Sequence, residues 1–352
     1  MINPILQHII ESSDDVQAGY AIQQNPNKVV QLDSDGTAYH VANPHKSLES
    51  NFKGLCNYIE DIRQTCGAGY VWTHTTMYLK GGRNEMAYYQ TYQRDRGNGM
   101  DPAIRERVSE LRKLLHNYQT DIITPKPQWY TEADDSMSVW HNKLIAEAGD
   151  DTISIIASGD KDLRMNCGQF YCLNDRKFSV QGRWTPNGWE DSYGHAEAVR
   201  PTGKHIKLTG RGTALFWAQM LCGDKADNIA GLPKMYGEHL DYYSPLKKGR
   251  RKPHETKACG IALACKVATT FQSDSAAYRA VAAAYKRHFG KDWDFFLFEN
   301  AFLLWMRKSY DVLDVLNFLK PLGFDYQLHP HQHKALQEYM AKCVQFNKEN
   351  NL

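Results

Sequence analysis

The chain has 352 residues, a formal net charge of +2 and an apolar fraction of 42%, which suits one large or two smaller globular domains. No apolar run approaches the ~20 residues of a membrane span, and the N-terminus lacks the basic start and cleavage site of a secretory signal, so we expect no membrane partner. The eight Cys include no CxxC pair, which indicates reduced thiols and predicts a cytoplasmic protein.

The first structured region is an apolar run over residues 29–32 that ends in Asp33 and Asp35. It predicts a strand that delivers two acids to the carboxyl edge of a parallel sheet, where such sheets bind ligands. Residues 47–66 carry apolar side chains at helical spacing and predict the crossover helix. Residues 70–72 then predict the next strand.

Residues 80–113 combine many basic side chains with tyrosines, among them Arg83, Tyr92, Arg94 and Arg96. Positive charge and aromatic rings together suit nucleic acid, the charge for phosphates and the rings for stacking. Glycines on both sides of residues 83–96 favour a mobile arch there. For residues 105–113 a solvated helical face is an equally good interpretation.

A helix predicted from residue 131 to about 148 opens with Thr131 as N-cap and three acids, Glu132, Asp134 and Asp135. The helix dipole favours acids in a first turn, so one or two of them need no functional explanation. Three exceed that need, which indicates a role in binding or catalysis.

The central stretch of the chain is TISIIASGDKDL, residues 152–163. Its apolar, β-branched run predicts a buried parallel strand, and Asp160 and Asp162 follow at the strand's carboxyl end. Two acids this close repel each other unless water or a divalent cation separates them. Residues 174–210 then predict a β-rich excursion.

An apolar helix over residues 213–221 delivers Asp224 and Asp227, and a turn at Gly231 follows. Gly260 opens the next helix, which carries Lys266. Two helices around glycine-rich turns predict a helix-hairpin-helix, whose backbone N–H groups can hold a phosphate. The loop between them carries a basic run that suits DNA but that is more often simply solvated: Lys247, Lys248, Arg250 and Arg251.

We expect three regions: residues 1–220 as a core that includes an arch at residues 80–116, residues 221–310 as a DNA-binding region, and residues 311–352 as a C-terminal tail. The tail holds His329, His331 and His333 at alternate positions. A metal site is conceivable there, but a surface tail is the favoured interpretation.

Nine carboxylates fall into four groups that we expect to converge on one Mg²⁺ or Mn²⁺ site, since hard oxygen ligands select these ions. If these acids hold metal, the rest of the surface carries a surplus of positive charge, which suits a polyanion.

The motifs LDSDGTAYH, TEADDSM, SGDKDL and GDKADNIAGLP, in this order, resemble the flap-endonuclease/5′→3′ exonuclease superfamily over residues 28–310. The stretch PHET before Gly260 is similar to the form found in exonucleases of short-tailed bacteriophages. The resemblance implies a PIN-like α/β fold: a central, mostly parallel sheet flanked by helices, with a helical arch and an H3TH-type helix-hairpin-helix. It also implies a monomeric nuclease that cuts DNA near 5′ ends or flaps, and RNA in RNA–DNA hybrids, during phage replication, recombination or host DNA breakdown in the bacterial cytoplasm.

The resemblance also implies residue roles, in a reaction that uses two metal ions. The first ion would be held by Asp33, Asp35, Glu132, Asp134 and Asp135, and the second, more weakly, by Asp160, Asp162, Asp224 and Asp227. Phosphate contacts would come from Arg83, Arg94 and Arg96. DNA would be bound by Tyr92, by Gly231, Gly260 and Lys266, and by the basic loop.

Three positions depart from the family pattern. His74 lies in the stretch where the family has an Asp after its second strand. Gln93 and Arg94 follow Tyr92 where the family has a Lys. Ala262 stands at the second glycine of the hairpin, which puts a bound monovalent ion there in question.

Two other functions fit parts of the sequence. Residues 33–37 match the DxDGT opening of haloacid-dehalogenase-type phosphatases, with Asp33 as nucleophile and Asp35 as acid/base. That fold needs about four acids and gives Glu132 and the hairpin no role. A DNA-binding module with a degraded site is the other possibility, and the intact set of nine acids argues against it.

Overall fold

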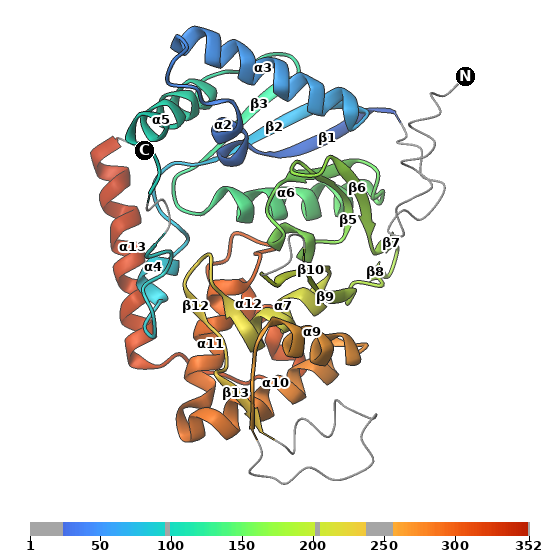
Figure 1. The fold of residues 1–352 in the computed structure, drawn as a ribbon, viewed down its shortest axis with the longest axis vertical. Coiled ribbons are helices and arrows are strands. Elements are labelled where there is room, and N and C mark those ends of the chain that lie inside the picture. The colour runs from blue at the N-terminus through green and yellow to red at the C-terminus, as the bar shows by residue number, and fades with distance from the viewer. Residues whose placement is uncertain (1–23, 96–98, 201–204, 237–255, 351–352) are drawn as a thin grey trace.

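The computed structural model describes residues 24–95, 99–200, 205–236 and 256–350 (Figure 1). Its centre is a six-stranded sheet in the order β3-β2-β1-β4-β5-β6, in which every pairing is parallel except that of β5 with β6. The strands are β1 Asn25–Asp33, β2 Ala68–Thr76, β3 Ile123–Gln128, β4 Ser154–Ser158, β5 Gly168–Cys172 and β6 Lys177–Gln181. The expected α/β class with a mostly parallel sheet is confirmed.

The strand order creates a switch point between β1 and β4. From β1 the chain first adds β2 and β3 on one side, and it then returns to add β4 and β5 on the other. At such a reversal the carboxyl ends of two neighbouring strands open into a crevice, which is where open α/β sheets bind ligands. Asp33 ends β1 and Ser158 ends β4, so the crevice lies where two of the predicted acid groups begin.

Helices cover both faces of the sheet (Figure 1). One face packs against α2 Ser34–Val41, α3 Leu48–Thr65 and α5 Pro102–His116, and the other against α6 Ala133–Ala148. Successive strand residues point to opposite faces, so Ile155 joins the apolar cluster of α3 and α5, while Ile156 packs with Met137 of α6. The run of buried apolar residues in β4 therefore reflects a strand covered on both sides.

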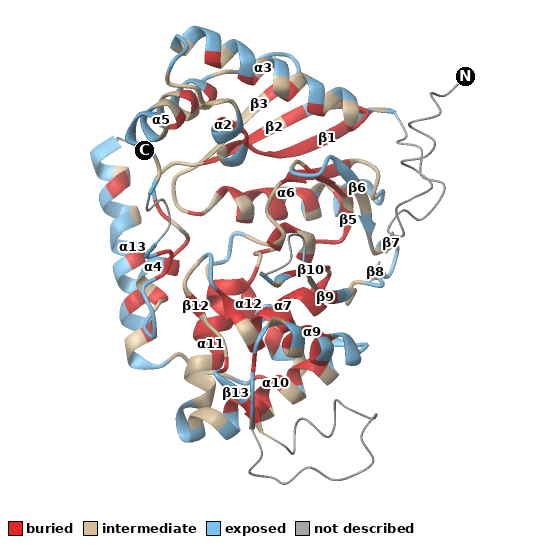
Figure 2. Cartoon of the chain, viewed as in Figure 1, coloured by how far each residue is buried: buried red, intermediate tan, exposed pale blue. Residues whose placement is uncertain are grey.

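A second region lies below the sheet and has its own apolar core. It contains α7 Thr213–Cys222, α9 Ile261–Thr270, α10 Asp274–Phe289, α11 Trp293–Leu304 and α12 Asp314–Leu319, with the strands β9 His195–Val199 and β10 Lys207–Arg211. The short elements are η1 Asp162–Met165, β7 Arg183–Thr185, β8 Gly188–Glu190, β11 Gly223–Asp224, β12 Ile229–Ala230, β13 Lys234–Tyr236, β14 Thr256–Ala258, η2 Gly290–Asp292 and η3 Lys320–Leu322. Helix α7 is buried almost throughout (Figure 2).

The predicted helix-hairpin-helix corresponds to α7 and α9, which pack against each other. Gly231 lies where a Cβ atom would come within 2.2 Å of the Cys222 carbonyl carbon. Glycine is therefore required at residue 231 by close backbone approach, whatever its role toward DNA. The intervening basic run of Lys247, Lys248, Arg250 and Arg251 falls outside the described residues.

The segment expected to form an arch has a different arrangement in its described part. Helix α5 connects β2 to β3 and packs on α2 and α3, so it is a crossover helix of the sheet. Its predecessor α4, Arg83–Met86, is only four residues long and packs against α11 and α13. In its described part, the segment over residues 80–116 contains one short helix, α4, and one crossover helix, α5.

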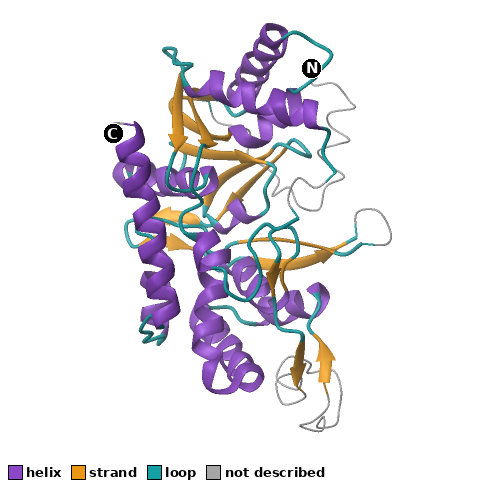
Figure 3. Cartoon of the chain, turned by 90° about the vertical axis from the view of Figure 1, so that its left-hand side faces the viewer, coloured by secondary structure: helices purple, strands orange, loops and turns teal. Residues whose placement is uncertain are grey.

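The expected tail forms a long helix, α13 Pro330–Asn350, which leads to the C-terminus (Figure 3) and packs against α4 (Figure 1). Its Phe346 ring stacks on Tyr78 and Trp129, and the Tyr339 hydroxyl donates to the Tyr130 carbonyl oxygen at 2.9 Å. These contacts join α13 to the segments that precede α4 and α6. His331 packs edge-on against Tyr88, while His329 and His333 are exposed. All eight Cys are free, and no helix within the described ranges has the length and apolarity of a membrane span.

Candidate metal centre

The carboxyl ends of β1 and β4 are joined by hydrogen bonds at the switch point. Asp33 caps α2 by accepting from the Gly36 N–H at 2.9 Å, and its other oxygen accepts from the Ser158 hydroxyl at 2.8 Å. The Ser158 hydroxyl oxygen in turn accepts from the Asp160 N–H at 2.9 Å. One serine therefore fixes the relative position of Asp33 and of the loop that carries Asp160.

Asp134, in the first turn of α6, lies against the same group of acids. Desolvation raises the pKa of its carboxyl well above the ordinary range, and the charges of Asp33 and Asp160 raise it further. Desolvation likewise raises the pKa of Asp33 to about 6, with added repulsion from Asp35 and Asp160. Such repulsion arises only where several carboxylates crowd together, and a divalent cation would relieve it.

Asp162 and Asp224 form a second group beside the first. Their carboxylates share the ammonium of Lys161, at 2.8 Å from Asp162 Oδ1 and 2.6 Å from Asp224 Oδ2. A small cavity is lined by acids from all the later motifs: Glu132, Asp134, Asp160, Asp162 and Asp227. Acids from three of the four predicted groups therefore line one cavity, and Asp33 and Asp35 lie at the adjoining strand end.

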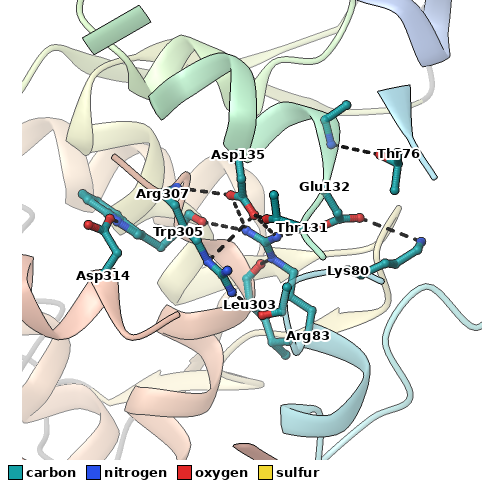
Figure 4. Close-up of polar contacts among 12 residues, drawn as sticks. Thr76, Lys80, Arg83, Thr131, Glu132, Asp135, Leu303, Trp305, Arg307 and Asp314 are labelled. Carbon is teal, nitrogen blue, oxygen red and sulfur yellow. Dashed lines mark hydrogen bonds and ion pairs between the residues drawn. The ribbon is translucent and has the colours of Figure 1, made fainter. Parts of the chain in front are cut away.

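Arg83 lies beneath α6 and is buried, with a side chain 1% exposed (Figure 4). Its guanidinium donates to both oxygens of Asp135 at 2.6 and 2.9 Å, to Glu132 at 2.8 Å, and to the Trp305 carbonyl oxygen at 2.9 Å. We expected Arg83 to contact a DNA phosphate. The structure corrects this, because Arg83 here is the buried partner of two acids.

Asp135 is equally enclosed. Besides Arg83, its carboxylate accepts from the Thr131 hydroxyl at 2.9 Å and from the Arg307 N–H at 3.2 Å. The adjacent guanidinium of Arg83 outweighs desolvation and lowers the pKa of Asp135 to about 2. A carboxylate with its oxygens already engaged has no lone pair directed at the other acids, so the arrangement does not favour Asp135 as a metal ligand.

Four side chains from the segment around α4 form hydrogen bonds or ion pairs with Glu132. In addition to Arg83, Tyr92 donates its hydroxyl at 3.0 Å, the Gln93 amide lies at 3.5 Å, and the Lys80 ammonium lies at 3.8 Å. Tyr92 is buried and therefore does not present its ring for stacking, which corrects its expected role. Lys80 and Gln93 were not among the predicted site residues, because nothing local in the sequence indicates that they reach Glu132.

Other predicted residues take more peripheral positions. Asp35 accepts from the Thr76 N–H at 3.1 Å and pairs with Arg112 at 2.8 Å. Arg94 is exposed and pairs with Asp95, and Arg96 is outside the described residues. Gly260 caps α9, and Lys266 is exposed on the same helix.

His74 does not replace the missing second-strand carboxylate. It is completely buried, and its ring nitrogens hydrogen-bond to Ser136 Oγ at 2.9 Å and Gln31 Oε1 at 2.8 Å. Desolvation lowers its pKa to about 3, which keeps the imidazole neutral. Both nitrogens are occupied, so His74 serves the packing of α6 on the sheet.

The donor set is compatible with hard divalent cations, since every converging ligand is a carboxylate oxygen. As the side chains stand, however, no group of three or more His, Cys, Asp or Glu within the described residues could hold a metal ion. Lys161, Arg83 and Arg112 each hold acids that a metal ion would need, and Asp33, Asp134 and Asp160 are the acids left to each other.

Comparison with solved structures finds similarity to nucleases of bacteriophage T5. A flap endonuclease complex with DNA and metal ions is 13% identical, with a TM-score of 0.44, over 84% of this chain and 97% of that chain. A T5 5′-exonuclease with bound zinc is 15% identical, with a TM-score of 0.44, over the same shares. No protein-family model matches the chain, and no curated protein matches it.

Proposed function

We propose that the chain is a divalent-metal-dependent 5′→3′ exonuclease or flap endonuclease that hydrolyses DNA phosphodiester bonds with two Mg²⁺ or Mn²⁺ ions. The observation that carries the proposal is the meeting of four sequence-distant acid groups at the switch point between β1 and β4. Phosphodiester hydrolysis needs an activated water and a stabilised leaving oxygen, and a pair of divalent ions supplies both.

The residues would divide this work by position. Asp33, Asp134 and Asp160 would hold the first ion, with Asp35 and Glu132 able to act through bound water. Asp162, Asp224 and Asp227 would hold the second ion. This division moves Asp160 to the first group, because its charge acts on both Asp33 and Asp134.

The DNA would approach from the side of exposed basic and aromatic groups. Arg94 is exposed. Tyr88 and Tyr89 are 59% and 54% exposed, so these two tyrosines replace Tyr92 as candidate stacking residues. The N-terminus of α9 at Gly260, with Lys266, would hold a strand of the duplex through backbone N–H groups and charge. We propose a monomer acting in the cytoplasm on DNA with 5′ ends or flaps, and on RNA–DNA hybrids.

The phosphatase alternative requires Asp33 to be a free nucleophile. Asp33 is instead buried, and both of its carboxylate oxygens accept hydrogen bonds. That chemistry also gives Glu132, Asp134 and Asp135 no role. The observations therefore favour the nuclease.

The test is Mg²⁺-dependent cleavage of a 5′-labelled duplex and of a 5′-flap substrate by the wild type and by Asp134→Asn. We expect short products from the 5′ end with the wild type and a loss of activity of at least about a hundredfold in the variant, as for removal of one catalytic electrostatic group. Asp121→Asn is the matched control, because Asp121 is exposed and precedes β3, at the edge of the sheet opposite the acid groups. If the wild type cleaves no DNA with Mg²⁺ or Mn²⁺ but hydrolyses p-nitrophenyl phosphate, the nuclease proposal fails.

A further inference from the structure

Lys161 lies between Asp160 and Asp162 in the sequence, and its ammonium group lies between the carboxylates of Asp162 and Asp224 in the structure. Its ammonium nitrogen is 2.8 Å from Asp162 Oδ1 and 2.6 Å from Asp224 Oδ2. The same two oxygens accept from the side-chain amide of Gln219, at 2.8 and 3.0 Å. The pair of oxygens is thus bridged twice, once by a charged donor and once by a neutral one.

The surroundings hold this arrangement in place. Gln219 is completely buried in α7, and the other Asp224 oxygen accepts from the Ala226 N–H at 2.8 Å. The Asp162 N–H donates to Asp160 Oδ1 at 2.8 Å, which fixes the backbone on which Lys161 sits. The Asp162 and Asp224 oxygens are therefore aligned on a point that the ammonium already occupies.

The neighbouring acids lack such a cation. Among the described residues, no lysine or arginine forms an ion pair with Asp33, Asp134 or Asp160. A divalent ion entering that group would find no ammonium or guanidinium hydrogen-bonded to these carboxylates among the described residues. An ion entering between Asp162 and Asp224 would meet an ammonium at the same oxygens, and two cations cannot share them without strong repulsion.

We propose that the ammonium of Lys161 is a resident counter-ion of the Asp162–Asp224 pair and competes there with the second divalent ion. The inference rests on the proposed function, since it concerns the same metal centre. The two ions then bind with unequal affinity: the first at Asp33, Asp134 and Asp160, the second only after Lys161 has been displaced. Lys161 acts in this way as a positioning residue that sets the metal concentration at which the centre fills.

The test measures Mn²⁺ binding to the folded, full-length protein by titration calorimetry and by the EPR signal of free Mn²⁺. We expect one tight and one weaker site in the wild type. In Lys161→Met the weaker site should tighten by about tenfold or more, the factor that corresponds to loss of a charged hydrogen-bonding competitor. The melting temperature can be measured without any activity assay. The metal-free variant should melt at a lower temperature than the metal-free wild type, and Mn²⁺ should raise the melting temperature of the variant by more than that of the wild type.

Two more variants make the result specific. Lys225→Met removes the same charge beside Asp224 in the sequence, but the Lys225 side chain is exposed, so second-site affinity should not change. Lys161→Gln keeps a hydrogen-bond donor without the charge and protects the test against misfolding of the Met variant. It should tighten the second site as well.

Unchanged or weaker second-site binding in both Lys161 variants would overturn the inference, as would an equal effect of Lys225→Met. The proposed function has a separate readout in DNA cleavage by the wild type. If the wild type cleaves DNA but Lys161 has no influence on Mn²⁺ affinity, only the role of Lys161 is lost. If the wild type binds no Mn²⁺ and cleaves no DNA, both proposals fail.

Discussion

Asp134 and Asp135 are neighbours in the sequence, yet they belong to two opposite electrostatic regions. Asp134 faces other carboxylates at the strand ends, and its pKa is raised well above the ordinary range by desolvation and repulsion. Asp135 faces Arg83 and Arg307 under α6, and these cations lower its pKa to about 2 against desolvation. Successive helix residues point about 100° apart, so one turn can supply one acid to each region.

The comparison shows how a strained centre is held in a stable protein. The arginine cluster of Arg83, Asp135 and Arg307 is compensated and ties α6 to α4 and to the end of α11. In the carboxylate centre, Asp33, Asp134 and Asp160 have no ion-pair partner among the described residues, and in our proposal bound cations stabilise them. The ion pairs of the arginine cluster thus hold α6 in place, and with it the acids that repel one another at the carboxylate centre.

The largest expected effect comes from breaking the compensated region. Arg83→Met leaves the buried Asp135 and the partly buried Glu132 without their main cation, and loss of one partner of a buried ion pair costs about 3–5 kcal/mol. Urea unfolding of the metal-free protein measures this loss. Arg94→Met is the control, since Arg94 is exposed and its removal should change stability by less than about 0.5 kcal/mol. Equal, small effects of both changes would show that the buried cluster is not an anchor.

A pH titration should separate the two regions by sign. The folded-state pKa of Asp33, about 6, lies above its ordinary value of 3.8, so the group favours folding most below pH 3.8, and this contribution is lost as pH rises through 6. Asp135 behaves in the opposite way: its contribution is present above pH 3.8 and is lost as pH falls toward 2.

Asp33→Asn keeps a good helix cap and removes the titrating group. In EDTA, the variant should gain stability relative to the wild type between pH 4 and pH 7, by about 1–3 kcal/mol. Chemical unfolding of both proteins at each pH measures the difference between their free energies of unfolding. The buried histidines contribute equally to both proteins, so their effect cancels in this difference. A difference that stays constant over this range would contradict the raised pKa of Asp33.

The smallest effect is expected at the outer edge of the compensated region, where Lys342 of α13 pairs with Glu85 of α4 at 2.6 Å. Lys342 is half-exposed, so solvent screens its charge although the Glu85 side chain is only 6% exposed, and Lys342→Met should cost about 1 kcal/mol. Thermal unfolding measures this cost, with Lys334→Met on the same helix as control. A loss of several kcal/mol would mean that this pair, rather than Arg83, anchors α4.

The sequence by itself determined the sheet and the acids at its edge. Short apolar runs ending in Asp33 and Asp160 define strands and their carboxyl ends, and these are local properties of the chain. Alternation of such strands with helical patterns predicts a parallel sheet, and its carboxyl edge predicts where the acids meet. The four groups could be recognised because each is compact in the sequence.

Only the tertiary structure decided what each charged side chain does. Asp135 and Arg83 were predicted to act at the centre, but Trp305 and Arg307, about 170 to 220 residues away, enclose them. Gln219 similarly completes the bridge of Lys161, and α13 became part of the core through Tyr130 and Trp129. Burial and ion pairing depend on partners that are distant in the chain, and no local pattern encodes which of several equivalent carboxylates will face a cation.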